Sequence, residues 1–430
     1  DFDTALEVTR AGTVFTTHAT VLGRALASAQ KDLYNILDTI DPEKEAYAHG
    51  VAAKHQLERA TAQAAHVFTT VSDITGLEAE KLLKRKPDIL LPNGLDLDAF
   101  PSFEEASIKH AQHKRRIKDF IISTLFPTQT FNIDETYLFF TFARYEYRNK
   151  GIDVTIKALA ALNKKLLDEK SPRTIVMFFF VPTSVRNIRL DVLESKRAYE
   201  DLKESVDNEK ENLLSNVLIN LASQRNLAKE TLFSADFLTD TKRKILRFKH
   251  KGNPPLCTHE LTYPETQDQI LTALHTNGLT NKTEDRVKAL FYPTYLTGAD
   301  GLLDLSYYET ILGCHLGIFP SVYEPWGYTP LEAGALGVAA VTTDLAGFGK
   351  WLCTNCSISG NPGIFVLPRH NISDDKVIVG LSDILYRYAT FTKEERIANK
   401  IEARRLASGA DWKKLIANYL EAHERAVGGT

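Results

Sequence analysis

The chain is poor in sulfur-containing residues and has no long apolar run. It contains four cysteines and one methionine among 430 residues. So few cysteines in a chain of this length do not form a disulfide framework, and we expect reduced thiols and a cytoplasmic location. No run of about 18 or more apolar residues occurs, so we expect no membrane-spanning helix and no membrane partner.

Neither sign of charge is in excess. The chain has 52 Lys and Arg against 55 Asp and Glu, a net charge of −3. A nucleic-acid partner calls for clustered excess Lys and Arg, so we expect none. A hydrophobic fraction of 43% and a charged fraction of 25% are typical of a globular protein. The length allows two or three domains.

The cysteines do not make a convincing metal site. Cys353 and Cys356 form an isolated C-x-x-C pair, whereas a structural zinc site needs two more ligands. Cys257 and Cys314 would each have to come from a distant part of the sequence. We expect no metal ion and no cofactor.

The chain begins with Asp1 instead of a methionine, and its only methionine is Met177. An apolar strand pattern follows almost at once, at residues 13–17. We expect either a fragment or a protein whose first part is missing.

Two α/β units are indicated along the sequence. Residues 1–135 carry two near copies of Val-Phe-Thr-Thr, at 14–17 and 67–70, and a third strand pattern at 88–91. The copies fit two parallel strands that end at one cleft, although shared strand chemistry explains the echo equally well. Three strands are few for a doubly wound domain.

The second unit is predicted over residues 136–380, followed by C-terminal helices over 381–430. Apolar strand patterns lie at 137–142, 174–181, 287–291, 316–319 and 339–342, and a helix follows Gly151. An insertion spans about 185–285. Its charged, amphipathic part at 185–250 indicates a helical hairpin or a coiled coil.

The most informative segment is residues 319–332. A strand pattern ends there, Gly327 allows a tight turn, and Thr329, Pro330 and Glu332 fit a helix-capping box. The amides at a helix start suit phosphate, and Glu324 and Glu332 flank them. We interpret this as an anion site beside two carboxylates. The alternative is a loop carboxylate and a capping residue without further function.

The same segment carries a family resemblance. The spacing of Glu324 and Glu332 resembles the paired glutamates of retaining glycosyltransferases. The motif Tyr-Glu-Pro-Trp-Gly-Tyr-Thr-Pro at residues 323–330 resembles the corresponding motif of animal and fungal glycogen synthases. The resemblance implies an α/β fold of two facing Rossmann-like domains (GT-B), the first one truncated. It also implies transfer of glucose from UDP-glucose to the 4-hydroxyl of an α-1,4-glucan, with retention and without a metal.

Further segments resemble the family residue by residue. In residues 16–24, His18 would lie beside the donor glucose and Arg24 would contact the donor side of the cleft. In residues 143–151, where the family has Gly in place of Ala143, Arg144 and Lys150 would hold the diphosphate. Forked and compact cations of this kind suit phosphate oxygens.

The remaining site residues also follow from the resemblance. Glu324 would contact the sugar ring, and Glu332 would lie by the ribose. The implied substrate-binding residues are Arg24, Asn93, Tyr307, Trp326, Gly327, Tyr328 and Thr329, with Tyr307 stacked on the uracil. For a lone histidine, an Asn-Gly turn or a strand-supporting tyrosine, a structural role is the alternative.

A basic helix face near the C-terminus resembles the family's sugar-phosphate-sensing helix in part. Arg396, Lys400 and Arg405 are the candidate allosteric residues. Lys400 stands at one family arginine position and Glu402 at another, which weakens the expectation of regulation by glucose 6-phosphate. A solvated basic face is the alternative.

The family's N-terminal glycine-rich loop, which closes over the donor, has no counterpart in this sequence. Two rivals to glycogen synthesis stay open: another retaining transferase that makes trehalose, sucrose or a glycan, and a catalytically inactive binding or assembly protein, which the missing loop suggests. The resemblance further implies subunit contacts through the inserted helices, so we expect a homo-oligomer, as a tetramer.

Overall fold

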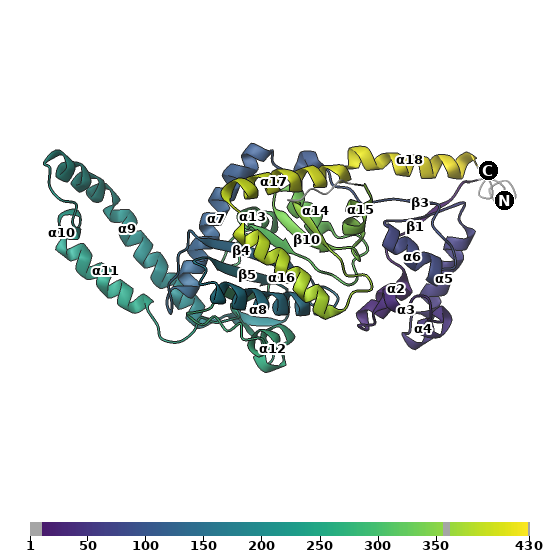
Figure 1. Ribbon diagram of the computed structural model, residues 1–430, viewed down its shortest axis with the longest axis horizontal. Coiled ribbons are helices and arrows are strands. Elements are labelled where there is room, and N and C mark those ends of the chain that lie inside the picture. Colours follow the sequence, from purple (N-terminus) through teal and green to yellow (C-terminus); the bar gives the residue numbers. More distant parts are fainter. Residues whose placement is uncertain (1–10, 356–361, 429–430) are drawn as a thin grey trace, which may run out of the picture.

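The computed structural model describes residues 11–355 and 362–428. A small first sheet lies at one end of the molecule and a larger second sheet at its centre (Figure 1). The first sheet consists of β1 (Val14–Thr17), β2 (Val67–Thr70) and β3 (Ile89–Leu90), all parallel. The two Val-Phe-Thr-Thr copies pair in register, from Val14 with Val67 to Thr17 with Thr70. The predicted parallel pair is confirmed.

Helices and turns of the first unit surround this sheet. They are α2 (Val21–Ser28), α3 (Leu33–Ile36), α4 (Pro42–Ala48), α5 (Ala52–Ala64), α6 (Asp73–Leu82) and the short 3₁₀ turn η1 (Leu97–Ala99). Thr20 caps α2, because its hydroxyl accepts the amide hydrogen of Gly23 at 2.9 Å. This cap sets where α2 begins, next to the carboxyl end of β1.

The second sheet has six parallel strands in the order β11-β10-β9-β4-β5-β8. They are β4 (Thr136–Phe142), β5 (Thr174–Phe180), β8 (Val287–Tyr292), β9 (Leu316–Ile318), β10 (Ala339–Thr343) and β11 (Ile364–Leu367). Nearly every residue of these strands is buried, as in a parallel sheet covered on both faces. Five of the six strands reproduce the apolar runs that predicted them, whereas β11 was not predicted from the sequence.

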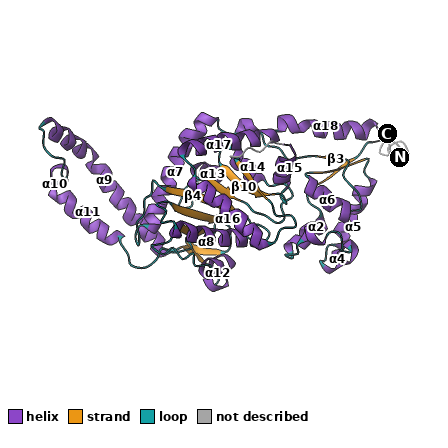
Figure 2. Cartoon of the chain, in the orientation of Figure 1, coloured by secondary structure: helices purple, strands orange, loops and turns teal. Residues whose placement is uncertain are grey.

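Helices cover both faces of the second sheet (Figure 2). One face packs against α8 (Ile152–Asp168), α12 (Gln269–Thr276) and α16 (Asp374–Thr390), and the other against α7 (Phe103–Leu125), α13 (Tyr307–Gly313), α14 (Tyr328–Ala335) and α17 (Lys393–Ala407). Side chains of β4 alternate between the faces: Phe139 belongs to the first cluster and Phe140 to the second. The remaining helices near this sheet are α15 (Gly347–Asn355) and the 3₁₀ turns η2 (Glu265–Gln267) and η3 (Ser408–Ala410).

Two helices pack with the unit that is distant in sequence. α7 lies within the expected first unit, residues 1–135, yet its Ile117 and Phe120 are buried with the second sheet. In turn, α18 (Trp412–Gly428) runs back along the molecule to the first sheet (Figure 1), where Ala422 and Ala426 pack with Val67. Each unit is therefore completed by a helix beyond its sequence limits.

The insertion is a projecting helical hairpin (Figure 1). Its arms are α9 (Leu190–Ala222) and α11 (Ala235–Phe248), joined through α10 (Lys229–Leu232), and the antiparallel strands β6 (Val185–Ile188) and β7 (His259–Leu261) form its base. At the base, Tyr199 and Lys203 contact Asp119 of α7 at 3.0 and 2.7 Å. Of the two arrangements expected for this segment, the chain itself forms a hairpin. None of the helices in the described ranges has the length and apolar composition needed to cross a membrane.

Gly151 joins two loops at the carboxyl edge of the second sheet. It caps α8 with a φ of 66°, and a Cβ placed there would lie less than 3.0 Å from the carbonyl oxygen of Pro320. The turn after β4 and the loop after β9 can therefore approach each other only with glycine at this position.

We expect Gly151→Ala to destabilise the protein more than Gly50→Ala. Gly50 has a φ of 67° and no atom within 4 Å of such a Cβ, so its substitution isolates the backbone strain of roughly 1–2 kcal/mol. Gly151→Ala adds the clash with Pro320, a further loss of roughly 1–3 kcal/mol. Denaturant unfolding of both variants measures the difference, and equal losses would contradict the close approach.

Candidate active site

A pocket of about 500 Å³ lies between the two α/β units. Its walls follow the carboxyl ends of parallel strands: Ala143 and Arg144 after β4, Phe319 after β9, and Ala346 after β10. His18, Arg24 and Asn93 line it from the first unit. Ligands of open α/β sheets bind at this edge. We call it the inter-domain pocket, and its position confirms the expected arrangement of two facing Rossmann-like domains.

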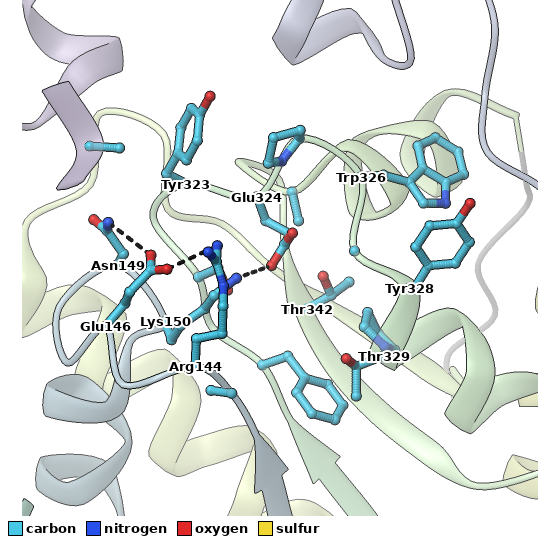
Figure 3. A pocket seen from close by; sticks show the side chains of 18 of the residues that line it. Arg144, Glu146, Asn149, Lys150, Tyr323, Glu324, Trp326, Tyr328, Thr329 and Thr342 are labelled. Atoms are coloured by element: carbon cyan, nitrogen blue, oxygen red, sulfur yellow. Dashed lines mark hydrogen bonds and ion pairs between the residues drawn. The ribbon is translucent and has the colours of Figure 1, made fainter. Parts of the chain in front are cut away.

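An ion pair stands at the centre of this pocket (Figure 3). Lys150 Nζ lies 2.5 Å from Glu324 Oε2, and the two side chains are 14% and 27% exposed. Arg144 is 73% exposed and pairs with Glu146 at 2.9 Å, while Asn149 donates to the same Glu146 at 3.2 Å. Both predicted diphosphate cations therefore face the pocket, each beside a carboxylate.

Backbone hydrogen bonds hold the two charged loops together. The amide of Val322 donates to the carbonyl of Asn149 at 2.8 Å, which ties the Glu324 loop to the Lys150 turn. The amide of Gly347 donates to the carbonyl of Glu324 at 2.9 Å. The position of Glu324 is therefore set by the turns that follow β4 and β10.

The N-terminus of α14, with its free backbone amides, forms another part of the pocket wall. Gly327 precedes the helix with a φ of 106°, and Gly327, Tyr328 and Thr329 line the pocket. The first amides of a helix lack acceptors within it, so they suit an anion. Trp326 also lines the pocket, but it is 3% exposed and packs on Phe348.

The predicted capping box is wrong. Because Gly327 adopts a left-handed conformation, α14 begins at Tyr328, and Thr329 is its second residue. Glu332 then lies beyond the first turn, where its carboxylate accepts hydrogen bonds from Tyr307 at 2.6 Å and Tyr308 at 2.9 Å. Burial and the Glu332 charge raise the pKa of Tyr308 to about 12.

Glu332 and Tyr307 do not line the pocket, among the residues described. The ring of Tyr307 contacts that of Phe142, a pocket residue, with centroids 4.8 Å apart. The roles expected of them, at the ribose and the uracil, stay predictions.

His18, Arg24 and Asn93 come together although they follow different elements. His18 comes directly after β1, Arg24 is in α2, and Asn93 follows β3. His18 and Arg24 are exposed, whereas Asn93 is 7% exposed. The first unit thus places one cation and one imidazole opposite Lys150 and Glu324.

Several pocket residues were not predicted from the sequence. They include Thr141, Phe142, Glu146, Asn149, Ser321, Tyr323 and Thr342. Thr141, Phe142 and Thr342 stand at strand ends, and the rule that parallel strands end at one edge could have found them. Tyr323 had no such signal, because its contacts are to the first unit.

The candidate allosteric residues lie elsewhere. A second pocket, of about 220 Å³, is lined by Lys114, Lys118, Arg173, His315, Lys393 and Arg396, among others. We call it the α17 pocket. Lys400 does not line this pocket, but burial and the charges of the lining residues Lys114 and Arg396 lower the pKa of Lys400 to about 8. Arg405 does not line this pocket, and it pairs with Glu402 at 2.7 Å.

The cysteines do not form a cluster in the described ranges. Cys257 and Cys314 are buried and Cys353 is exposed, all as free thiols. Cys356 lies outside the described residues. Within those residues, no group of three or more His, Cys, Asp and Glu could hold a metal ion.

Comparisons with known proteins identify the family of this chain. A family model described as glycogen synthase matches residues 4–429. The glycogen [starch] synthase of Caenorhabditis elegans is 38% identical, over 96% of this chain and 62% of its own length. The liver glycogen [starch] synthase of Mus musculus is also 38% identical, over 95% of this chain and 58% of its own length.

The chain thus spans about three fifths of the length of these curated relatives. A solved α,α-trehalose 6-phosphate synthase from Burkholderia multivorans has a distant likeness, with 10% identity and a TM-score of 0.47, over 88% of this chain and 64% of its own. From the match over residues 4–429 and the identity to the curated relatives, the chain belongs to the glycogen synthase family.

Proposed function

We propose that the inter-domain pocket transfers glucose from UDP-glucose to the 4-hydroxyl of an α-1,4-glucan with retention. The observation that carries the proposal is the Lys150–Glu324 pair beside the amide end of α14. In one pocket it combines a cation and helix amides, which hold a diphosphate, with a carboxylate able to contact the sugar. The family match favours glucan synthesis over the other retaining transferases.

The chemistry follows from where charge develops. In retaining transfer, the bond to the diphosphate breaks through an oxocarbenium-like sugar. Arg144, Lys150 and the α14 amides would stabilise the departing diphosphate as fixed donors. A diphosphate that binds Lys150 would replace Glu324 as the partner of the lysine charge. Glu324 would then face the cationic sugar, while His18 orients it from the other wall.

The location and the acceptor are part of the same proposal. The three described cysteines are free, which supports a reducing, cytoplasmic compartment. The glucan chain is the acceptor that the relatives' name implies, and a catalytically inactive assembly protein is the rival that a transfer assay separates from this proposal.

We expect Lys150→Ala to weaken UDP binding roughly 10- to 100-fold, because a charge-assisted hydrogen bond is lost. Glu324→Gln should bind UDP as well as the parent or better, since its charge no longer competes for Lys150. The same variant should lower glucosyl transfer about 100-fold. Calorimetry with a chelator present and a transfer assay measure these effects.

Lys157→Ala is the matched control, because Lys157 is exposed on α8, the helix that follows Lys150. An equal loss of UDP affinity in this control would contradict the site. So would a strict requirement for Mg²⁺ or Mn²⁺.

We also propose that the hairpin makes the protein a homo-oligomer, as a tetramer. Leu214 and Leu218, one helical turn apart on α9, are 57% and 68% exposed. Leu221 and Leu246 are 58% and 70% exposed. Apolar side chains exposed on the arms of a long hairpin favour contact with another subunit.

Replacing both Leu214 and Leu218 with Glu should reduce the assembly while leaving the fold intact, because both side chains are already exposed. Asn212→Glu with Ser215→Glu adds the same charge at exposed polar positions of α9 and should leave the assembly unchanged. Light scattering measures the mass. A monomeric parent, well above micromolar concentration, would contradict the proposal.

We propose further that the α17 pocket binds a sugar phosphate that regulates transfer. Lys114, Lys118, Arg173 and Arg396 line it, and Arg396 is held there by Tyr137 at 2.6 Å. Burial lowers the pKa of the nearby Lys400, and the charges of Lys114 and Arg396 lower it further. An anion would relieve their mutual repulsion.

We expect glucose 6-phosphate to raise the melting temperature more than equal inorganic phosphate does. Arg396→Ala should raise the half-saturating concentration about 10-fold, whereas Arg405→Ala should leave it unchanged. Because Lys400 loses its charge as the pH rises through about 8, binding should weaken over that range. Thermal shift titrations at several pH values measure this, and an equal response in both variants would contradict the site.

A further inference from the structure

Glu78 is a buried carboxylate outside the sequence-predicted site. It is in α6 and 0% exposed. Its Oε1 accepts the amide of Thr20 at 3.0 Å, the Thr20 hydroxyl, and the phenol hydroxyl of Tyr323 at 3.2 Å. One oxygen therefore joins a residue of the first unit to a residue of the second.

Both partners are connected to the inter-domain pocket, and Tyr323 is itself one of its lining residues. Thr20 caps α2, and Arg24 lies in the first turn of that helix. Tyr323 directly precedes Glu324. Both Arg24 and Glu324 line the pocket. Glu78 does not line it, but connects its two walls through Thr20 and Tyr323.

The surroundings restrict Tyr323 to this position. Its side chain is 7% exposed, and its ring stacks on Tyr34 of α3 with centroids 6.3 Å apart. Next to it, the hydroxyl of Ser72 donates to the carbonyl of Pro325 at 2.8 Å. The Glu324 loop thus meets the first unit on both sides of Glu324.

The carboxyl group of Glu78 is held away from water. Burial raises its pKa to about 7, although hydrogen bonds from Thr20 and Tyr323 oppose that rise. Its Oε2 has no hydrogen-bond partner in the part of the chain that the structure describes. Burying a carboxyl group costs free energy unless hydrogen bonds compensate it. The hydrogen bonds that Glu78 makes are those that connect the two walls of the pocket.

We infer that Glu78 is a positioning residue that sets the distance between Glu324 and the Arg24 wall through its hydrogen bonds to Tyr323 and Thr20. Its effect on transfer rests on the proposed function, whereas the mechanical link does not. A displacement of about 1 Å at a reacting group can cost about 100-fold in rate, so the link acts on turnover.

Hydrogen exchange tests the link without any assay of activity. Tyr323→Phe removes one hydrogen bond in the second unit. We expect it to speed amide exchange about 5-fold both in its own loop and across the interface in residues 20–24. Glu78→Met should speed exchange in the same two segments, and the double variant should add little, because both changes remove the same contact.

Glu58 provides the matched control. It accepts the Thr17 hydroxyl at 2.6 Å and the Val21 amide at 2.8 Å, at the same junction of β1 and α2. Glu58→Met should speed exchange in α2 and leave residues 320–325 unchanged. If Tyr323→Phe changes exchange only in its own loop, the inference is overturned.

Transfer kinetics separate positioning from a general loss of stability. Assayed well below its melting temperature, Tyr323→Phe should lower kcat about 10-fold and leave UDP affinity nearly unchanged, because Lys150 and the α14 amides remain in place. Glu78→Gln keeps an acceptor oxygen and should retain most of the kcat that Glu78→Met loses. Equal kcat in Glu78→Gln and Glu78→Met would overturn the positioning role. If the unmodified protein transfers no glucose, the proposed function is contradicted, and the hydrogen-exchange result alone decides whether the link exists.

Discussion

The site depends on one ion pair, between Lys150 and Glu324. The two residues are far apart in sequence, and they meet because β4 and β9 are neighbours in the second sheet. Their loops then approach so closely that Gly151 leaves no room for a side chain beside Pro320. The pair compensates a lysine that is only 14% exposed, and a lysine of this kind is costly without a partner. Strand order therefore brings this ion pair into the pocket.

The other wall of the pocket is carried by a small sheet that does not stand alone. Three short strands bury little apolar surface, and α18 returns from the end of the chain to cover them through Ala422 and Ala426. Conversely, α7 lies within the sequence limits of the first unit but packs on the second sheet. The helices α7 and α18 thus join the two units away from the pocket, whereas hydrogen bonds of Glu78 and Ser72 join the units beside it.

The two pockets differ in how their cations are balanced. In the inter-domain pocket, Lys150 and Arg144 each pair with a carboxylate, so a bound diphosphate exchanges one anion for another. In the α17 pocket, Lys118 pairs with Asp134 at 2.9 Å, but Arg396 is held by neutral oxygen atoms and Lys400 has a lowered pKa. In the proposed regulation, an anion there would add net charge compensation and stabilise the protein. The first arrangement fits the proposed glucosyl transfer, and the second fits the proposed regulatory ligand.

Local sequence patterns determined much of this protein. Apolar runs of strand length predicted five of the six strands of the second sheet, because a parallel sheet is buried on both faces. The motifs around Arg144, Lys150 and Glu324 pointed to these residues through their resemblance to a known family, and all three residues line the pocket.

Tertiary structure alone decided the rest. Glu332 has the spacing of a capping residue, yet the backbone of Gly327 starts the helix earlier and turns that carboxylate to two tyrosines. The link from Glu78 to Tyr323 joins positions 245 residues apart, and no periodicity of a sequence encodes such a contact. Patterns report which face of an element is buried, whereas the partner on that face is chosen by how the whole chain packs.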